Sequence, residues 1–242
     1  MSELPLIRTE QLRVGHGKVP LLPPFDMEIH AGQFWAIVGR NGGGKSTWLR
    51  TLLGLLPPIS GSIRPRADLR LAYLPQKSVA DDLYPLTARD VVEMGCLRSR
   101  SFIRLGPEQR RSVDSALELM GATPLAAEPF GTLSEGQRQR VLFARIAASG
   151  AELALLDEPT SAMDLVAERE AFELLRDLQR TTGVSLLVVS HYVRLVAEYA
   201  DHAVLLDRDT PAVVIGTPSS VFDHPAFKAR YAGSLPPPRA TD

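Results

Sequence analysis

The chain has 242 residues, 45% of them hydrophobic, and a formal net charge of −1. This many hydrophobic residues can form one large core or two modest ones. A net charge so close to zero produces no overall electrostatic attraction to nucleic acid or to an anionic membrane. One cysteine, Cys96, excludes an intramolecular disulfide and is typical of a reducing compartment. Neither a secretory signal nor a run of roughly 20 apolar residues is present. We therefore expect a soluble, cytosolic protein that reaches a membrane only through a partner.

The first half of the chain is dominated by strand patterns. The first thirty residues alternate apolar and polar positions between glycines and prolines, which predicts short antiparallel strands. The continuous apolar run 34–38 predicts a strand covered on both faces. A helix is predicted over 45–56, ended by Pro57 and Pro58, and another strand over 71–74.

From about residue 79 to 148 the pattern is helical. Thr87, Pro107 and Ser134 are typical helix-starting residues, and they predict helices over 89–94, 108–120 and 135–148. Alternating strands and helices then return: strands at 153–156, 185–189, 204–206 and 212–215, and helices at 162–180 and 192–200.

A glycine-rich segment over 39–47 reads Gly-Arg-Asn-Gly-Gly-Gly-Lys-Ser-Thr and matches G-x-x-x-x-G-K-[ST]. Glycines let backbone N–H groups approach a triphosphate closely, and the following helix adds its positive N-terminal end. Lys45 is expected to reach the β- and γ-phosphates, Ser46 to bind Mg²⁺, and Thr47 to support the α-phosphate side. The candidate phosphate-binding residues are Gly39, Asn41, Gly42, Gly43, Gly44, Lys45, Ser46 and Thr47.

Two acids, Asp157 and Glu158, follow the apolar strand 153–156. A buried strand fixes its end rigidly, and we expect this end to lie beside the phosphate loop. Asp157 is then placed to hold Mg²⁺ through a water, and Glu158 is placed to act as the general base toward the attacking water.

These patterns predict an α/β fold with a phosphate-loop (P-loop) NTPase core and a mostly parallel sheet. An N-terminal antiparallel β subdomain and an inserted helical subdomain complete it. We expect one domain, with 1–78 and 149–232 as the nucleotide-binding core and 79–148 as the helical insert. The proline-rich tail, 233–242, is expected to be disordered.

Four further segments carry a family resemblance. Residues 133–137, Leu-Ser-Glu-Gly-Gln, resemble the signature motif of ABC (ATP-binding cassette) ATPases. Gln76 resembles the Q-loop glutamine of that family, His191 its switch histidine, and residues 161–164, Ser-Ala-Met-Asp, its D-loop. The resemblance covers residues 4–225 in family order.

The resemblance implies a site shared by two cassettes. Ser134, Gly136 and Gln137 would contact the γ-phosphate of ATP held by the opposite subunit, and Asp164 would couple the two sites. His191 would bind the γ-phosphate and orient the attacking water. Gln76 would ligate Mg²⁺ and link the site to the helical insert. The expected cofactors are ATP and Mg²⁺, and a homodimer is the simplest active unit.

Three positions depart from the family pattern. His16 stands where an aromatic residue usually stacks on adenine, and an imidazole stacks less extensively than a tyrosine. Glu135 replaces a common glycine of the signature; an acid close to a phosphate is unfavourable unless its side chain faces away. Met163 replaces a leucine of similar size.

Residues 73–76 and 84–95 look most like cassettes of zinc, manganese and iron-chelate importers. The resemblance thus implies membrane permease subunits, a substrate-binding protein and a location at the cytoplasmic face of the membrane. The chain's five histidines and one cysteine form no metal-ligand spacing, so a cargo metal would pass through the partner.

Three alternatives stay open. One is a transporter for another substrate, or an exporter. Another is a soluble ABC ATPase acting on DNA or ribosomes, although no basic stripe favours a nucleic-acid partner. The third is a regulatory module that binds nucleotide without hydrolysis.

Overall fold

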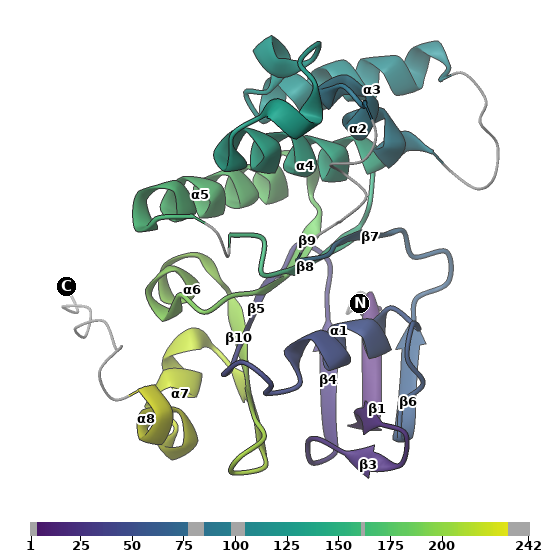
Figure 1. Ribbon diagram of the computed structural model, residues 1–242. Coiled ribbons are helices and arrows are strands. Elements are labelled where there is room, and N and C mark those ends of the chain that lie inside the picture. Colours follow the sequence, from purple (N-terminus) through teal and green to yellow (C-terminus); the bar gives the residue numbers. More distant parts are fainter. Residues whose placement is uncertain (1–3, 77–84, 98–104, 161–162, 232–242) are drawn as a thin grey trace. The chain divides into compact units, whose positions relative to one another are not determined.

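The computed structural model describes residues 4–76, 85–97, 105–160 and 163–231. The chain divides into two compact units, which are described separately (Figure 1). Unit 1 comprises Met1–Asp68 and Leu187–Asp242, and unit 2 comprises Leu69–Leu186.

Unit 1 contains an antiparallel sheet of order β4-β1-β6, formed by β1 (Ile7–Arg13), β4 (Phe25–Ile29) and β6 (Ser60–Pro65). Strand β1 pairs with β4 in the register Ile7↔Ile29, which confirms the predicted antiparallel N-terminal strands. The sequence did not predict β6, because its residues are mostly polar and none is buried. A short hairpin, β2 (Gly15–His16) and β3 (Val19–Pro20), lies between β1 and β4 in the chain.

Unit 1 also contains parallel strands. β5 (Phe34–Val38) pairs in parallel with β10 (His202–Asp207), and β10 pairs antiparallel with β11 (Ala212–Gly216); β10 and β11 contain the predicted strands 204–206 and 212–215. All five residues of β5 are buried, as its apolar run predicted. Strand β9 (Ser185–Val189) crosses the boundary between the units, and the backbone N–H of Ser190 donates to the carbonyl of Ile37 at 3.1 Å.

Three short helices cover one face of these strands: α6 (Val193–Tyr199), α7 (Pro218–Asp223) and α8 (Pro225–Tyr231) (Figure 1). Phe222 and Phe227 pack on each other with ring centroids 4.7 Å apart, and Phe227 is fully buried. Each such ring contributes roughly 2–3 kcal/mol through burial. The sequence analysis made no prediction for α7 and α8, although Thr217 caps α7 and a proline opens each helix.

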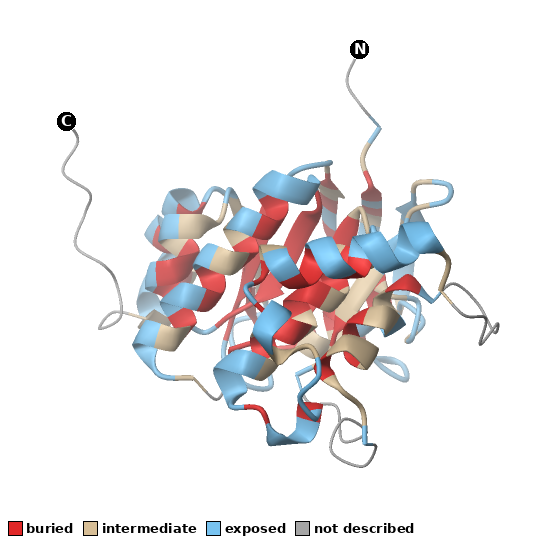
Figure 2. Ribbon diagram, turned by 90° about the horizontal axis from the view of Figure 1, so that it is seen from above, coloured by how far each residue is buried: buried red, intermediate tan, exposed pale blue. Residues whose placement is uncertain are grey.

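Unit 2 combines strands with helices. β7 (Leu71–Leu74) pairs in parallel with β8 (Leu153–Asp157), with Leu71 opposite Leu153. Its main helices are α2 (Ala88–Glu93), α3 (Pro107–Leu119), α4 (Glu135–Ser149) and α5 (Leu165–Thr182). The helices carry buried stripes on one face and exposed residues on the other, as Figure 2 shows in red and pale blue.

Two helix boundaries differ from the predictions by more than two residues, and several others differ by one or two. Helix α1 (Lys45–Leu52) begins at the predicted residue but ends before Pro57, because Gly54 adopts a left-handed conformation with φ 70° and its N–H bonds back to Thr51. Helix α5 begins at Leu165, because the Asp164 side chain caps it, whereas the predicted start was residue 162. The predicted disordered tail lies outside the described residues.

Candidate nucleotide-binding site

The phosphate loop of unit 1 connects β5 to α1. Gly44 is the N-cap of α1 with φ 95°, a left-handed conformation that glycine adopts without a steric penalty, and no side chain caps the first turn. The first backbone N–H groups of a helix receive no bond from within the helix, and those of α1 follow directly on the loop. Since the dipole of α1 adds positive potential at the same place, the loop fits the phosphates of a nucleotide.

Lys45 lies in the middle of this loop. Its side chain is 4% exposed, and Nζ donates to the carbonyls of Gly39 at 2.8 Å and Arg40 at 3.0 Å. These bonds hold the ammonium group inside the curve of the loop, where it can meet the β- and γ-phosphates. Asn41 and Gly42 are exposed, Gly43 is buried, and Ser46 is half-buried.

His16 and Thr47 come together in unit 1, although 31 residues separate them in the chain. The Nε2 atom of the exposed His16 lies 3.2 Å from the hydroxyl of Thr47. The β2–β3 hairpin thus brings an imidazole to the first turn of α1.

His191 follows β9 and is exposed. The preceding residue is anchored on both sides: the N–H of Ser190 donates to Ile37 of β5, and the Ser190 hydroxyl accepts from the N–H of Tyr192 at 3.0 Å. His191 is therefore held at the carboxyl end of β5, from which the phosphate loop begins.

Unit 2 brings the two carboxylates and the glutamine together. Asp157 is 3% exposed at the end of β8, and Glu158 follows it. The side-chain amide of Gln76 donates to Glu158 Oε2 at 2.6 Å. Since Nε2 of Gln76 binds Glu158, the oxygen of the same amide is the atom that can face a cation. Hydroxyl, carboxylate and amide oxygens are the ligands that Mg²⁺ prefers, so Ser46, Asp157 and Gln76 fit that ion by type.

The sequence analysis missed a buried contact behind Glu158. Thr160 is 3% exposed, and its hydroxyl donates to Glu168 Oε1 at 2.8 Å. Glu168 is 0% exposed, and among the described residues its Oε2 has no hydrogen-bond partner. Burial raises the pKa of Glu168 to about 7, which outweighs the lowering effect of the bond from Thr160. In the sequence, the only signal is an acid placed on the apolar face of an amphipathic helix.

The signature segment forms the first turn of α4. Ser134 caps this helix and forms a capping box with Gln137: the Ser134 hydroxyl accepts from the Gln137 N–H, and the Gln137 side chain accepts from the Ser134 N–H at 3.0 Å. All four residues from Ser134 to Gln137 are exposed. A Cβ atom added to Gly136 would meet no atom of the described residues within 4 Å. Packing against the described part of the chain therefore does not require glycine at this position.

Asp164 caps α5, and its carboxylate accepts from the N–H groups of Val166 at 3.1 Å and Ala167 at 2.9 Å. Leu165 and Val166, which follow it, are 64% and 70% exposed. The D-loop residues 161–162 lie outside the described residues.

Together, the glycine-rich loop, the buried lysine and the strand-end carboxylates define a P-loop nucleotide-binding protein. The family model described as "ABC transporter" matches residues 22–161, more than half of the chain. The chain belongs to this family, and it is an ATPase of the ABC class.

Curated relatives cover most of the chain. A zinc import ATP-binding protein, ZnuC, of Cereibacter sphaeroides is 34% identical over 93% of this chain and 88% of its own length. The ZnuC protein of Pseudomonas entomophila is 37% identical over 92% of this chain and 82% of its own. A zinc transport system ATP-binding protein, TroB, of Treponema pallidum is 34% identical over 95% of this chain and 88% of its own length.

Solved structures have the same fold. A chain of a metal-chelate type ABC transporter in an inward-facing conformation aligns with a TM-score of 0.84 at 29% identity, over 94% of this chain and 89% of the other. The cbiO1 protein of Clostridium perfringens, part of the ABC transporter complex cbiONQ, aligns with a TM-score of 0.78 at 26% identity, over 95% of each chain. The α/β fold with a mostly parallel sheet is therefore that of ABC ATPases, as predicted.

Proposed function

We propose that this chain is the ATP-hydrolysing subunit of a membrane transporter that imports a metal ion or a metal chelate. The observation that carries the proposal is the resemblance over nearly the full length to subunits of zinc importers, combined with the intact hydrolytic residues. Among the described residues, no helix is long and apolar enough to cross a membrane. The cargo would therefore pass through separate permease subunits, with this chain docked on their cytoplasmic side.

The proposed residue roles are those that the motifs and the family resemblance imply. Lys45 and the N–H groups of α1 would bind the β- and γ-phosphates, and Glu158 would accept the proton of the attacking water. His191 would orient that water. Ser46, Gln76 and Asp157 would hold Mg²⁺, which supplies charge neutralisation at the phosphates.

The signature turn supports a site shared between two cassettes. An exposed helix N-terminus with a serine cap can bind anions, and Gly136 leaves room for close approach although no described residue of its own chain packs against it. Ser134, Gly136 and Gln137 would then contact ATP bound to a second copy, with Asp164 lying near the same interface. A substrate-binding protein would deliver the cargo outside the membrane.

Affinity purification tests the transport role. A tagged Glu158→Gln chain, purified from native membranes with ATP, is expected to bring a polytopic membrane protein with it and to dimerise on ATP addition. Glu170→Gln is the matched control, because this exposed carboxylate lies away from the site, 3.6 Å from Arg140. It should retain hydrolysis. Recovery of soluble proteins or nucleic acid alone would contradict the transport role.

The cargo needs a second measurement. In the complex rebuilt in vesicles, zinc or a zinc-loaded binding protein is expected to stimulate ATP hydrolysis and to be taken up. The alternative is a transporter of another substrate, or an exporter. Stimulation by a non-metal solute, or outward movement, would favour that alternative while leaving the ATPase unaffected.

A further inference from the structure

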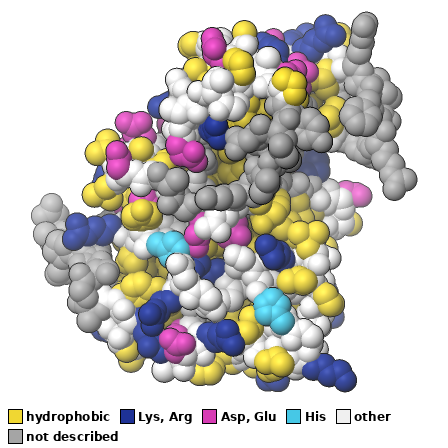
Figure 3. Space-filling model, viewed as in Figure 1, with side chains coloured by type: hydrophobic (Ala, Val, Ile, Leu, Met, Phe, Trp, Pro, Cys, Tyr) yellow, Lys and Arg dark blue, Asp and Glu magenta, His cyan; other side chains and the backbone are white. Residues whose placement is uncertain are grey.

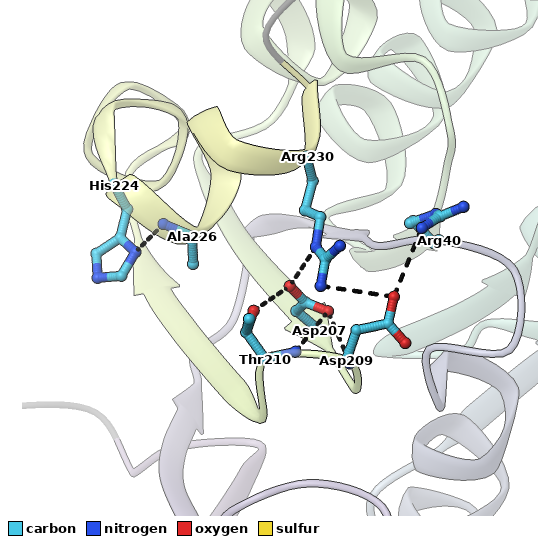
Figure 4. Close-up of polar contacts among 7 residues, drawn as sticks. All are labelled: Arg40, Asp207, Asp209, Thr210, His224, Ala226 and Arg230. Carbon is cyan, nitrogen blue, oxygen red and sulfur yellow. Dashed lines mark hydrogen bonds and ion pairs between the residues drawn. The ribbon is translucent and has the colours of Figure 1, made fainter.

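The carboxylate of Asp207, at the end of β10, is a buried junction in unit 1. The side chain is 6% exposed and accepts from the Thr210 hydroxyl at 2.5 Å, the N–H of Asp209 at 3.0 Å and Nε of Arg230 at 3.1 Å (Figure 4). Burial alone would raise the pKa of Asp207, but the bonds from Thr210 and Arg230 outweigh it and hold the pKa below its ordinary value. The carboxylate is therefore ionised and firmly paired.

The turn that Asp207 begins supports the phosphate loop from behind. A Cβ atom on Gly39 would lie 2.5 Å from the carbonyl oxygen of Leu206, and one on Gly43 would lie 3.2 Å from the same oxygen. The Leu206 carbonyl thus packs against both ends of the loop, and only glycine tolerates so close an approach at Gly39. A shift of this turn would move the backbone that cradles the phosphates.

A second contact joins the loop to the turn. It spans a small cavity of about 300 Å³, and residues 40–43 and 206–209 line this cavity. Asp209 Oδ2 lies 3.5 Å from Nη1 of Arg40 in the loop and 3.5 Å from Nη2 of Arg230 in α8. Arg230 therefore contacts both aspartates of the turn. The carbonyl of Arg40 also accepts from Lys45 Nζ, so Arg40 is part of the phosphate loop that holds the lysine.

The two ion pairs differ in strength. Arg40 and Asp209 are 66% and 59% exposed, and such a surface pair contributes little. Arg230 and Asp207 are 24% and 6% exposed, so loss of the arginine would leave a buried carboxylate short of a partner. Helix α8 is itself held by the buried Phe227, whose ring packs on Phe222 of α7 with centroids 4.7 Å apart.

We propose that Arg230 is a positioning residue for ATP binding, which holds the β10–β11 turn against the phosphate loop through Asp207 and Asp209. It lies far along the chain from the loop and acts through the turn. Loss of the Arg230 side chain should weaken ATP binding at the phosphate loop while leaving the hydrolytic residues in place.

The test compares Arg230→Gln with Lys228→Gln on the same helix, α8, because the ion pair of Lys228 with Asp223 of α7 has both partners more than half exposed. We expect Arg230→Gln to raise the KM and the dissociation constant for ATP about 10-fold, equivalent to about 1.4 kcal/mol. The kcat should change less than about 2-fold, and Lys228→Gln should change neither constant. Arg230→Lys should recover part of the ATP affinity, because an ammonium group can pair with one of the two carboxylates, Asp207 or Asp209, but not with both at once.

A purely structural role predicts another result. If Arg230→Gln lowers the melting temperature but leaves the KM and ATP affinity unchanged below it, the proposal is wrong. A fall in kcat alone would overturn it as well. If Arg230→Gln fails to fold, Asp209→Asn tests the proposal instead. This substitution of an exposed residue should raise the KM for ATP about 2-fold without changing the melting temperature. An unchanged KM would refute the proposal.

Discussion

The side-chain amide of Gln76 donates a hydrogen bond to the carboxylate of Glu158, with Nε2 and Oε2 2.6 Å apart. The two residues are 82 positions apart in the chain, and both stand at carboxyl ends of neighbouring strands, β7 and β8. Glu158 also has φ 50°, a left-handed conformation that is uncommon outside glycine and costs roughly 1–3 kcal/mol. Glu158, the proposed general base, is thus held by its surroundings in a conformation that its backbone alone would not favour.

Gln76→Ala removes both a restraint on the Glu158 carboxylate and a proposed Mg²⁺ ligand. We expect kcat for ATP hydrolysis to fall about 10- to 100-fold, with the KM for ATP changed less than about 3-fold. Steady-state phosphate release over a range of ATP and Mg²⁺ concentrations measures both. Gln11→Ala is the control, because its amide binds Asp26 at 3.0 Å in a similar contact elsewhere. An unchanged kcat in Gln76→Ala would refute a role for this amide.

Gly136→Ala separates stability from assembly. The added methyl group meets no atom of the described chain within 4 Å, and alanine favours a helix over glycine by about 0.5–1 kcal/mol, so the melting temperature should stay equal or rise. ATP-driven dimerisation, measured by sizing in the Glu158→Gln background, should weaken about 10-fold if the turn meets a partner's phosphate.

Gly131→Ala is the matched control for this change, because a Cβ atom there also meets nothing within 4 Å. It should leave dimerisation unaltered. If Gly136→Ala dimerises as well as its parent, the turn is not in close contact with nucleotide.

Glu168 gives stability a defined pH dependence. Its pKa is raised from 4.5 to about 7 in the folded chain, so the unfolded chain releases this proton first as the pH rises. The contribution of Glu168 to the free energy of unfolding is therefore full below about pH 4.5 and is lost as the pH rises to about 7. The loss amounts to at most about 3 kcal/mol.

Glu168→Gln should remove this dependence, because an amide cannot ionise and its oxygen still accepts from Thr160. Urea unfolding at several pH values between 5 and 8 measures the difference from the parent chain, which should grow in favour of the variant as the pH rises. Glu170→Gln, on the exposed face of the same helix, should show no such trend. A difference for Glu168→Gln that does not vary with pH would contradict the raised pKa.

His16→Tyr tests the adenine contact. A phenol ring offers a larger stacking surface at the place where His16 contacts Thr47, so ATP affinity should rise about 2- to 10-fold, corresponding to 0.5–1.5 kcal/mol. Titration of the Glu158→Gln chain with a fluorescent ATP analogue measures this. His16→Leu supplies apolar volume without a ring and should weaken binding. Equal or weaker affinity for His16→Tyr would rule out stacking there.

The sequence predicted the absence of a strong overall charge but not which individual charges pair. The net charge of −1 predicts no strong field, and acidic and basic side chains are interspersed on the face shown in Figure 3. The sequence did not indicate which of these charges pair. Arg230, Asp207 and Asp209 appear in it as ordinary polar residues near the end of the chain.

The sequence by itself determined most of the strands, the starts of α1 and α4, and the phosphate loop, because these depend on neighbours within a few residues. Thr87 and Ser134 cap helices as predicted, and β5 and β9 occupy the predicted ranges 34–38 and 185–189. Capping and burial on both faces leave local patterns that can be recognised without a structure.

Only the tertiary structure decided which distant side chains meet. The bonds from Gln76 to Glu158 and from Arg230 to Asp207 join residues 82 and 23 positions apart, and nothing in the local pattern specifies them. Strand β6 likewise has no apolar signal and forms because β1 offers it an unpaired edge. Local patterns determine elements, whereas the packing of those elements brings particular donors and acceptors together.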